Sequence, residues 1–171
     1  LNNLIVDNNK LIEVDEVDFA MAFINKSNIS NLKLMDENFF LYFESTDACL
    51  NLRKQNKKIY VIENIKFTHH GTSSSDIFLK NKIDINRNWH FSWSKFYLFK
   101  KHYNYFYGLK KTMPNFFHSL KWFIICKVKF MISKTNKEEL AGNLHRAVLS
   151  GLINSYLLKK SSYRPFGKKN N

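Results

Sequence analysis

The sequence predicts an α/β or α+β fold in which strands come first and a basic, helical segment follows. Two observations support this prediction. Short β-branched and aromatic runs, separated by polar breaks, occupy the first half of the chain. From Trp89 onward, apolar residues instead recur at spacings of three and four, which is typical of helices. The 171 residues are 44% hydrophobic, which is enough for a real core and too much for a wholly disordered chain.

The first half is expected to hold short strands and one short helix. The expected elements are a buried strand or short helix at 17–24, a loop at 25–31, a helix from Thr46 to about Gln55, a strand at 58–63, a second strand at 65–69, and a loop at 71–76. Ser45 is expected to cap the helix, because a serine hydroxyl can accept a hydrogen bond from a free N–H of the first turn. Ala48, Cys49 and Leu52 share one face of this helix, which we expect to be buried.

The second half is expected to form amphipathic helices. One begins near Trp89, and Pro114 is expected to start the next, since proline suits the first turn of a helix. Thr135 and Glu138 form a capping-box pattern for a last helix. The apolar side expected for the helix after Pro114 consists of Phe116, Leu120, Phe123, Ile124, Val128 and Met131.

Charge is divided unevenly along the chain. Residues 1–80 hold 9 Lys/Arg and 11 Asp/Glu, a net of −2, whereas residues 81–171 hold 18 and 3, a net of +15. A strongly basic second half indicates a polyanionic partner, either nucleic acid or an anionic membrane surface. The aromatic and lysine-rich stretch 89–103 fits both, and it also fits an ordinary amphipathic helix with solvated lysines.

Several classes of protein are disfavoured by composition. No apolar stretch approaches the roughly 20 residues that cross a bilayer. The first residues show no charged n-region followed by an apolar h-region, so we expect no secretory signal among them. Two cysteines, Cys49 and Cys126, make no disulfide framework and suit a reducing compartment. Because the chain begins with Leu1, we expect that it starts inside a longer protein.

Two carboxylates, Glu44 and Asp47, stand three residues apart at the predicted start of a helix. The partial positive charge of a helix N-terminus favours an ionised carboxylate there, which can accept a proton from a substrate hydroxyl. The alternative is that Asp47 only favours the helix start, as acidic first turns commonly do.

A pair of histidines, His69 and His70, is followed by Gly71 and then by Ser73 and Ser74. Imidazole can ligate a metal or carry a proton, and the glycine and the hydroxyls suit an anion. About 22 residues separate Asp47 from His69, which is enough for a helix out and a strand back. Both side chains are therefore expected to face one cleft.

Taken in order, these blocks resemble the C-terminal half of family 2 glycosyltransferases, most closely the rhamnosyltransferase-like members that extend bacterial surface polysaccharides. The blocks that carry the resemblance are Val17-Asp18-Phe19, Met35-Asp36-Glu37-Asn38-Phe39-Phe40-Leu41-Tyr42-Phe43-Glu44, Asp47 with Arg53, His69-His70-Gly71 with Ser73-Ser74, Ser94-Lys95-Phe96-Tyr97, Lys100-Lys101-His102, and Tyr163-Arg164-Pro165.

The resemblance implies a GT-A fold, with residues 1–85 as the acceptor-side half of the catalytic domain and residues 86–171 as a basic, membrane-associating helical tail. It implies an inverting transfer of a sugar from a nucleotide-sugar donor to a hydroxyl of a lipid-linked or cell-surface glycan. The expected location is cytoplasmic, at the inner face of the plasma membrane, with an anionic membrane surface and no nucleic acid among the partners.

The resemblance also assigns roles to residues. Asp47 and Glu44 are the expected base and its orienting partner, and His69 is expected to contact the metal or the diphosphate. Mg²⁺ or Mn²⁺ is the expected cofactor, stabilising the departing diphosphate. The residues expected to bind substrate are Asp18, Asp36, Glu37, Ser73, Ser74 and Lys95.

The chain departs from the family pattern in three places, and at one of them Lys33-Leu34 stands where relatives often have Gly-Gly. It has no Asp-x-Asp motif and lacks the nucleotide-binding strands that normally precede one, so we expect the acceptor-side half alone. Ser45 stands where many relatives carry an aspartate, which leaves Glu44 or Asp47 to act as the base. Two alternatives follow: a catalytically inactive remnant without the donor half, or a basic nucleic-acid-binding module.

Overall fold

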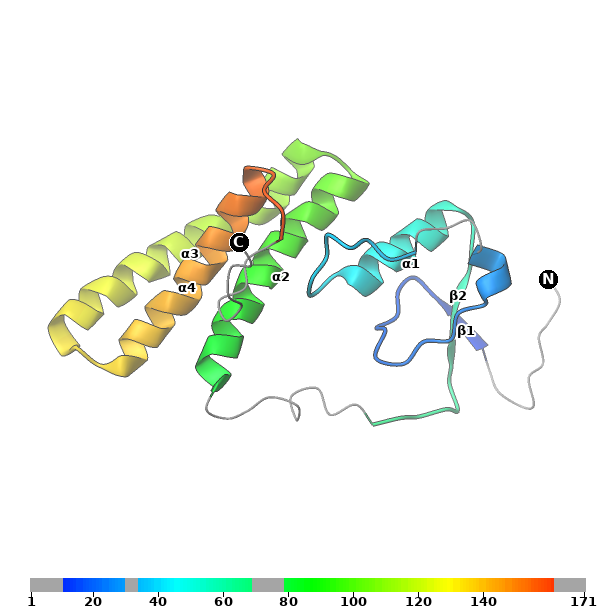
Figure 1. Ribbon diagram of the computed structural model, residues 1–171, viewed down its shortest axis with the longest axis horizontal. Coiled ribbons are helices and arrows are strands. Elements are labelled where there is room, and N and C mark those ends of the chain that lie inside the picture. The colour runs from blue at the N-terminus through cyan, green and yellow to red at the C-terminus, as the bar shows by residue number, and fades with distance from the viewer. Residues whose placement is uncertain (1–10, 30–33, 69–78, 162–171) are drawn as a thin grey trace, which may run out of the picture. The chain divides into compact units, whose positions relative to one another are not determined.

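The computed structural model describes residues 11–29, 34–68 and 79–161 (Figure 1). In this part of the chain the fold is mostly helical, with one small antiparallel sheet. The elements are β1 (Leu11–Val14), a 3₁₀ turn (Lys26–Ile29), α1 (Glu44–Lys54), β2 (Ile59–Ile62), α2 (Lys80–His102), α3 (Tyr105–Ser133) and α4 (Asn136–Tyr156). The expected order, with strands before a helical second half, is confirmed at this coarse level.

The described residues form two compact units. The first contains residues 11–29, 34–36 and 44–68, and the second contains residues 37–43 and 79–161. The expected division at residue 85 falls inside α2.

The sheet of the first unit pairs β1 with β2 in antiparallel register, with Leu11 opposite Ile62 and Val14 opposite Ile59. The Lys58 ammonium lies 2.7 Å from the Glu13 carboxylate and ties the two chain segments together. The strand expected at 58–63 is therefore confirmed, but its partner is β1, which lies more than 40 residues earlier. The strand expected at 65–69 is wrong for residues 65–68, which have no regular structure.

The apolar run at 17–24 is not the expected buried strand or helix. Its residues form turns and irregular backbone, and the Phe23 side chain is 88% exposed. Only a four-residue 3₁₀ turn follows, inside the loop expected at 25–31.

Helix α1 is confirmed, with a start that differs from the expected one. It begins at Glu44, so Ser45 lies inside the helix and is not its cap. The reason lies in Tyr42 and Phe43, which both have φ of 68° and therefore cannot continue a right-handed helix backwards. Ala48 and Cys49 are buried as expected.

In the second unit α2, α3 and α4 pack against one another along their lengths (Figure 1). Trp89 and Trp93 of α2 form the centre of the core with Ala147 of α4. Both indoles are hydrogen-bonded, because Trp89 Nε1 donates to Ser150 Oγ at 3.2 Å and Trp93 Nε1 donates to the carbonyl of Lys159 at 2.9 Å. The two tryptophans therefore join α2 to α4 and to the residues just after α4.

The start expected at Pro114 is wrong, because Pro114 is the tenth residue of α3. Asn104 caps this helix instead, with its Oδ1 accepting a hydrogen bond from the Tyr107 N–H at 2.8 Å. The start of α4 after Thr135 is confirmed, although the Thr135 side chain makes no capping hydrogen bond. Lys134, between the two helices, ends α3 in a left-handed conformation with φ of 49°.

Candidate functional site

The start of α1 holds the two carboxylates that the sequence singles out. Glu44 is the first residue of the helix and Asp47 the fourth, so both lie in the turn whose N–H groups have no intrahelical partner. The field of those groups is positive and favours ionised carboxylates.

The two carboxylates differ in their surroundings. Asp47 is fully buried and accepts a hydrogen bond from the Asn51 side-chain amide at 3.3 Å, one turn along the helix. Glu44 is partly exposed, yet its Oε2 is buried, and no described residue offers that oxygen a hydrogen-bond partner. Asp47 is thus held in place, whereas Glu44 has an oxygen with unused acceptor capacity.

The backbone that leads into α1 is strained. Tyr42 and Phe43 occupy the left-handed region, which costs bulky residues about 1–3 kcal/mol each. Their rings offset this cost by packing on Phe91 of α2, with centroid separations of 5.5 and 5.1 Å. Unusual backbone held by surrounding contacts concentrates at functional sites, and here it immediately precedes Glu44.

Residues 15–17 of the first unit lie against α1. The Asp15 carboxylate is 2.8 Å from the Arg53 guanidinium, and the Thr46 hydroxyl donates to the Glu16 carboxylate. The Cys49 thiol donates to the carbonyl of Val17 at 3.8 Å, and burial raises the pKa of this thiol. The backbone of Val17, the residue before Asp18, therefore contacts α1, the helix that carries Glu44 and Asp47.

The remaining expected site residues fall in different places. Asp36 is half-buried in the first unit and Glu37 is exposed in the second. Lys95 lies on α2, where its ammonium donates to the Asn115 side chain of α3 at 3.4 Å. His69, Ser73 and Ser74 lie outside the described residues, as does the block at 163–165. The expected convergence of His69 with the carboxylates therefore stays a prediction.

Two of the blocks that carry the family resemblance meet in the second unit. Ser94 Oγ donates to the carbonyl of Leu41 at 2.9 Å, and Asn38 donates to the Tyr97 hydroxyl at 3.1 Å. The Phe39 ring packs edge-on against Tyr97 at 5.0 Å. The block at 94–97 therefore anchors the segment that precedes Glu44, a role that the sequence alone did not reveal.

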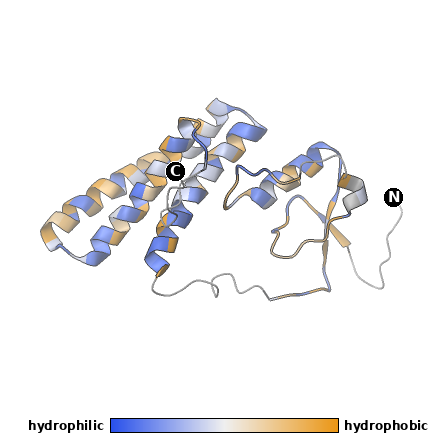
Figure 2. Ribbon diagram, in the orientation of Figure 1, coloured by the Kyte–Doolittle hydropathy of each residue, from blue (hydrophilic) through white to orange (hydrophobic). Residues whose placement is uncertain are grey.

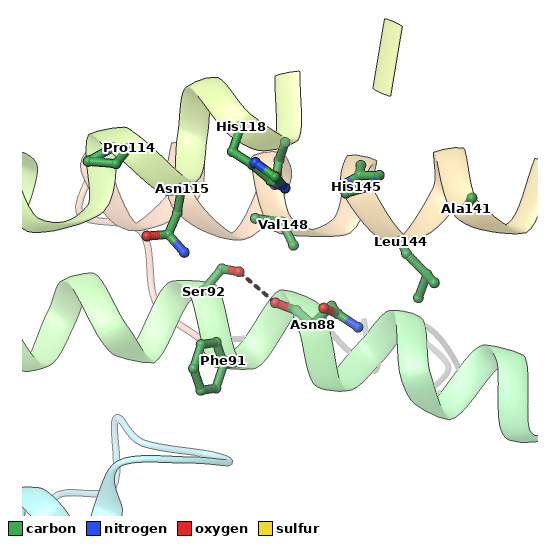
Figure 3. A pocket seen from close by; sticks show the side chains of 11 residues that line it. Asn88, Phe91, Ser92, Pro114, Asn115, His118, Ala141, Leu144, His145 and Val148 are labelled. Atoms are coloured by element: carbon green, nitrogen blue, oxygen red, sulfur yellow. Dashed lines mark hydrogen bonds between the residues drawn. The ribbon is translucent and has the colours of Figure 1, made fainter. Parts of the chain in front are cut away.

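A hollow lies among the three helices of the second unit (Figure 3). It has a volume of about 560 Å³. Its polar lining residues are Asn88 and Ser92 from α2, Asn115, His118 and Ser119 from α3, and His145 from α4. Sequence reasoning did not find this hollow, although pairs of small polar residues four apart, such as Asn88 with Ser92 and Asn115 with Ser119, were a readable signal.

The two histidines of this hollow approach each other, with ring centroids 6.2 Å apart. Burial, and secondarily the neighbouring His118, lowers the pKa of His145. Trp122 stacks on His145 with an angle of 16° between the ring planes. The hollow offers amide, hydroxyl and imidazole groups, and none of the described residues that line it is a carboxylate.

The expected metal finds no ligand set among the described residues, where no three His, Cys, Asp or Glu side chains gather. None of the helices described is both long enough and apolar enough to cross a membrane. No protein-family model, curated protein or solved structure matches the chain.

Proposed function

We propose that this chain forms the acceptor-side part of an inverting, rhamnosyltransferase-like glycosyltransferase with a GT-A catalytic domain. The observation that carries the proposal is the placement of Glu44 and Asp47 in the first turn of α1, directly after the strained pair Tyr42 and Phe43. The ordered blocks of the sequence, from Val17 to Pro165, supply the resemblance to the family.

The proposed chemistry is proton removal from an acceptor hydroxyl. As the hydroxyl oxygen attacks the anomeric carbon of a nucleotide-bound sugar, its proton passes to a carboxylate of the enzyme and the diphosphate leaves on the opposite face. A base for this step needs an unused acceptor oxygen near the substrate. The Glu44 side chain is partly exposed whereas Asp47 is fully buried, so Glu44 fits this role better than Asp47.

Asp47 is assigned the supporting role. Its carboxylate is held by Asn51 and lies one turn from Glu44 on the same helix. Held in this way, the Asp47 carboxylate fixes the first turn of the helix from which Glu44 projects.

The test is sugar transfer by the full-length protein from nucleotide-sugar donors to a hydroxyl acceptor. Glu44→Gln should lower kcat about 10²–10⁴-fold, as expected for removal of a general base, and Asp47→Asn should lower it less. Glu138→Gln is the matched control, because Glu138 also lies in a helix first turn with a buried, unpartnered Oε2 among the described residues.

Two results would contradict the proposal. If Glu44→Gln and Asp47→Asn both keep the wild-type rate, the base is elsewhere. If the full-length wild type neither binds nucleotide-sugars in calorimetry nor transfers sugar, the chain is the inactive remnant. Tight binding to oligonucleotides that falls steeply with salt would instead favour the nucleic-acid-binding alternative.

A further inference from the structure

Helix α3 has two faces of opposite character. Its buried residues are all small: Gly108, Thr112, Ser119 and Cys126. They recur at spacings of four and seven and face the rest of the second unit. Small side chains let two helices approach closely, so the large apolar residues of α3 are left on the opposite face.

That opposite face is a continuous apolar stripe. Its members are exposed and recur at spacings of three, four and seven: Phe106, Met113, Phe117, Leu120, Ile124, Val128 and Met131. Phe106 is 79% exposed and Met131 76% exposed, at the two ends of the helix. Figure 2 shows hydrophobic colouring along much of α3. Exposed apolar patches of this extent mark interaction surfaces.

The stripe lies in a strongly basic part of the chain. No Asp or Glu occurs between Asp84 and Glu138, whereas that stretch holds ten Lys and one Arg. Five of the lysines belong to α3 itself: Lys110, Lys111, Lys121, Lys127 and Lys129. Lys111 lies over the Tyr107 ring at 5.5 Å and Lys127 over the Phe123 ring at 5.9 Å, so lysine stems run along apolar surface while their charges stay outside.

We propose that the apolar stripe of α3 lies on an anionic lipid bilayer, parallel to its surface. A helix with an exposed apolar face and lysines at its margins inserts the apolar side chains among the acyl chains and places the ammonium groups at the phosphates. A second copy of the chain is a poor occupant of the stripe, because it would bring five more lysines against these five. The inference rests on the proposed function for its purpose, since a lipid-linked acceptor is met at a membrane.

The test is flotation of the full-length protein with phosphatidylcholine vesicles, with and without phosphatidylglycerol. The wild type should float only with the anionic vesicles, and added salt should weaken the binding. The double variant Phe117→Ser with Ile124→Ser should bind at least tenfold more weakly, since each side chain contributes buried apolar area. Its matched control is Met21→Ser with Phe23→Ser, two exposed apolar residues of the first unit.

A charge variant tests the same surface without touching the apolar residues. Lys121→Gln with Lys127→Gln should weaken binding about fivefold per lysine, whereas Lys57→Gln with Lys66→Gln, in the first unit, should not. Equal binding to neutral and anionic vesicles would overturn the proposal. Unchanged vesicle binding by the α3 variants would also overturn it. A third contrary result is a wild type that binds no vesicles and is a dimer in light scattering, while the Phe117→Ser with Ile124→Ser variant is a monomer.

Failure of this inference is separable from failure of the proposed function. If both hold, the Phe117 and Ile124 variant loses vesicle binding but keeps transfer to a soluble acceptor, whereas Glu44→Gln loses transfer and keeps vesicle binding. If the wild type fails to bind vesicles, its sugar transfer to a soluble acceptor can still be measured. If it fails to transfer sugar, its vesicle binding can still be measured.

Discussion

Ser94 on α2 holds the carbonyl of Leu41, three residues before the helix that carries Glu44, through a hydrogen bond of 2.9 Å. Ser94 is fully buried, so no water can replace its hydroxyl. The contact joins two sequence blocks that lie more than 50 residues apart, and it supports the segment in which Tyr42 and Phe43 adopt their strained conformations.

Ser94→Ala should therefore destabilise the fold by about 1–3 kcal/mol, the cost of leaving a carbonyl without its donor. Urea unfolding measures this change. Ser92→Ala is the matched control, since the Ser92 hydroxyl is also buried but donates only to the Asn88 carbonyl of its own helix at 2.7 Å. Equal losses from the two variants would show that the Leu41 contact adds nothing.

Gly151 of α4 crosses α2 at the backbone of Trp89. A Cβ at position 151 would lie 2.4 Å from the Trp89 carbonyl oxygen, which is too close for any real contact. Gly151→Ala should destabilise the fold by about 1–3 kcal/mol, even though alanine favours a helix over glycine by about 1 kcal/mol. Thermal and urea unfolding test this prediction.

Gly142, on the same helix, supplies the control. A Cβ there would meet only the Cys126 Cβ at 3.5 Å, an ordinary contact. Gly142→Ala should therefore be neutral or stabilising, by up to about 1 kcal/mol. A stabilising effect from both substitutions would rule out the close crossing of α2 and α4.

Thr112 connects α3 to the end of α4. Its hydroxyl donates to the Gly108 carbonyl at 2.7 Å and therefore accepts from the Tyr156 hydroxyl, 3.0 Å away. Burial raises the pKa of Tyr156, so this hydroxyl keeps its proton and remains a donor at neutral pH. Thr112→Val should cost about 1–3 kcal/mol in urea unfolding, because it leaves a half-buried donor unpaired.

Ser133→Ala is the comparison for Thr112→Val. The Ser133 hydroxyl also donates to a carbonyl one turn back, that of Lys129 at 2.9 Å, but it is exposed, and water replaces it. The expected change is within about 0.5 kcal/mol. A loss as large as that of Thr112→Val would mean that burial and the Tyr156 contact do not matter.

Local patterns were enough to predict part of the fold. The β-branched run that became β2 and the acidic start of α1 are visible within a few residues. The partner strand β1 could not be predicted in this way. Leu11–Val14 is short, and it pairs with Ile59–Ile62, a segment more than 40 residues away in the sequence. The start of α3 was misplaced because the Asn104 cap, ten residues earlier, outweighs the usual preference of proline for a first turn.

The apolar periodicity of α3 was visible in the sequence, but the sequence did not say whether the apolar face is buried or exposed. Four residues of the expected apolar side, Leu120, Ile124, Val128 and Met131, are exposed. Periodicity locates a face without saying which face is covered. The covered face of α3 is instead the one with the small buried residues, where Cys126 lies against Gly142 of α4.

The candidate site was predictable in the same limited way. Glu44 and Asp47 were found from their spacing and their place at a helix start. The burial of Asp47, the unpartnered Oε2 of Glu44 and the support from Ser94 depend on tertiary contacts. The hollow between His118 and His145 depends on the packing of three helices, so no single segment reveals it.

His145 predicts how acid affects the helical unit. Its pKa is lowered from the ordinary 6.5, first by burial and then by His118, so the folded state resists protonation while the unfolded chain accepts it. The contribution of neutral His145 to the free energy of unfolding should therefore be fully present above about pH 6.5. It should fall as the pH drops from there toward the lowered pKa of His145 in the folded protein, and it should level off below that pKa. His145→Gln should remove much of this loss, measured as urea midpoints between about pH 5 and pH 8, whereas His102→Gln, outside the hollow, should follow the wild type. An acid loss of the same size in His145→Gln and the wild type would assign the effect to other groups.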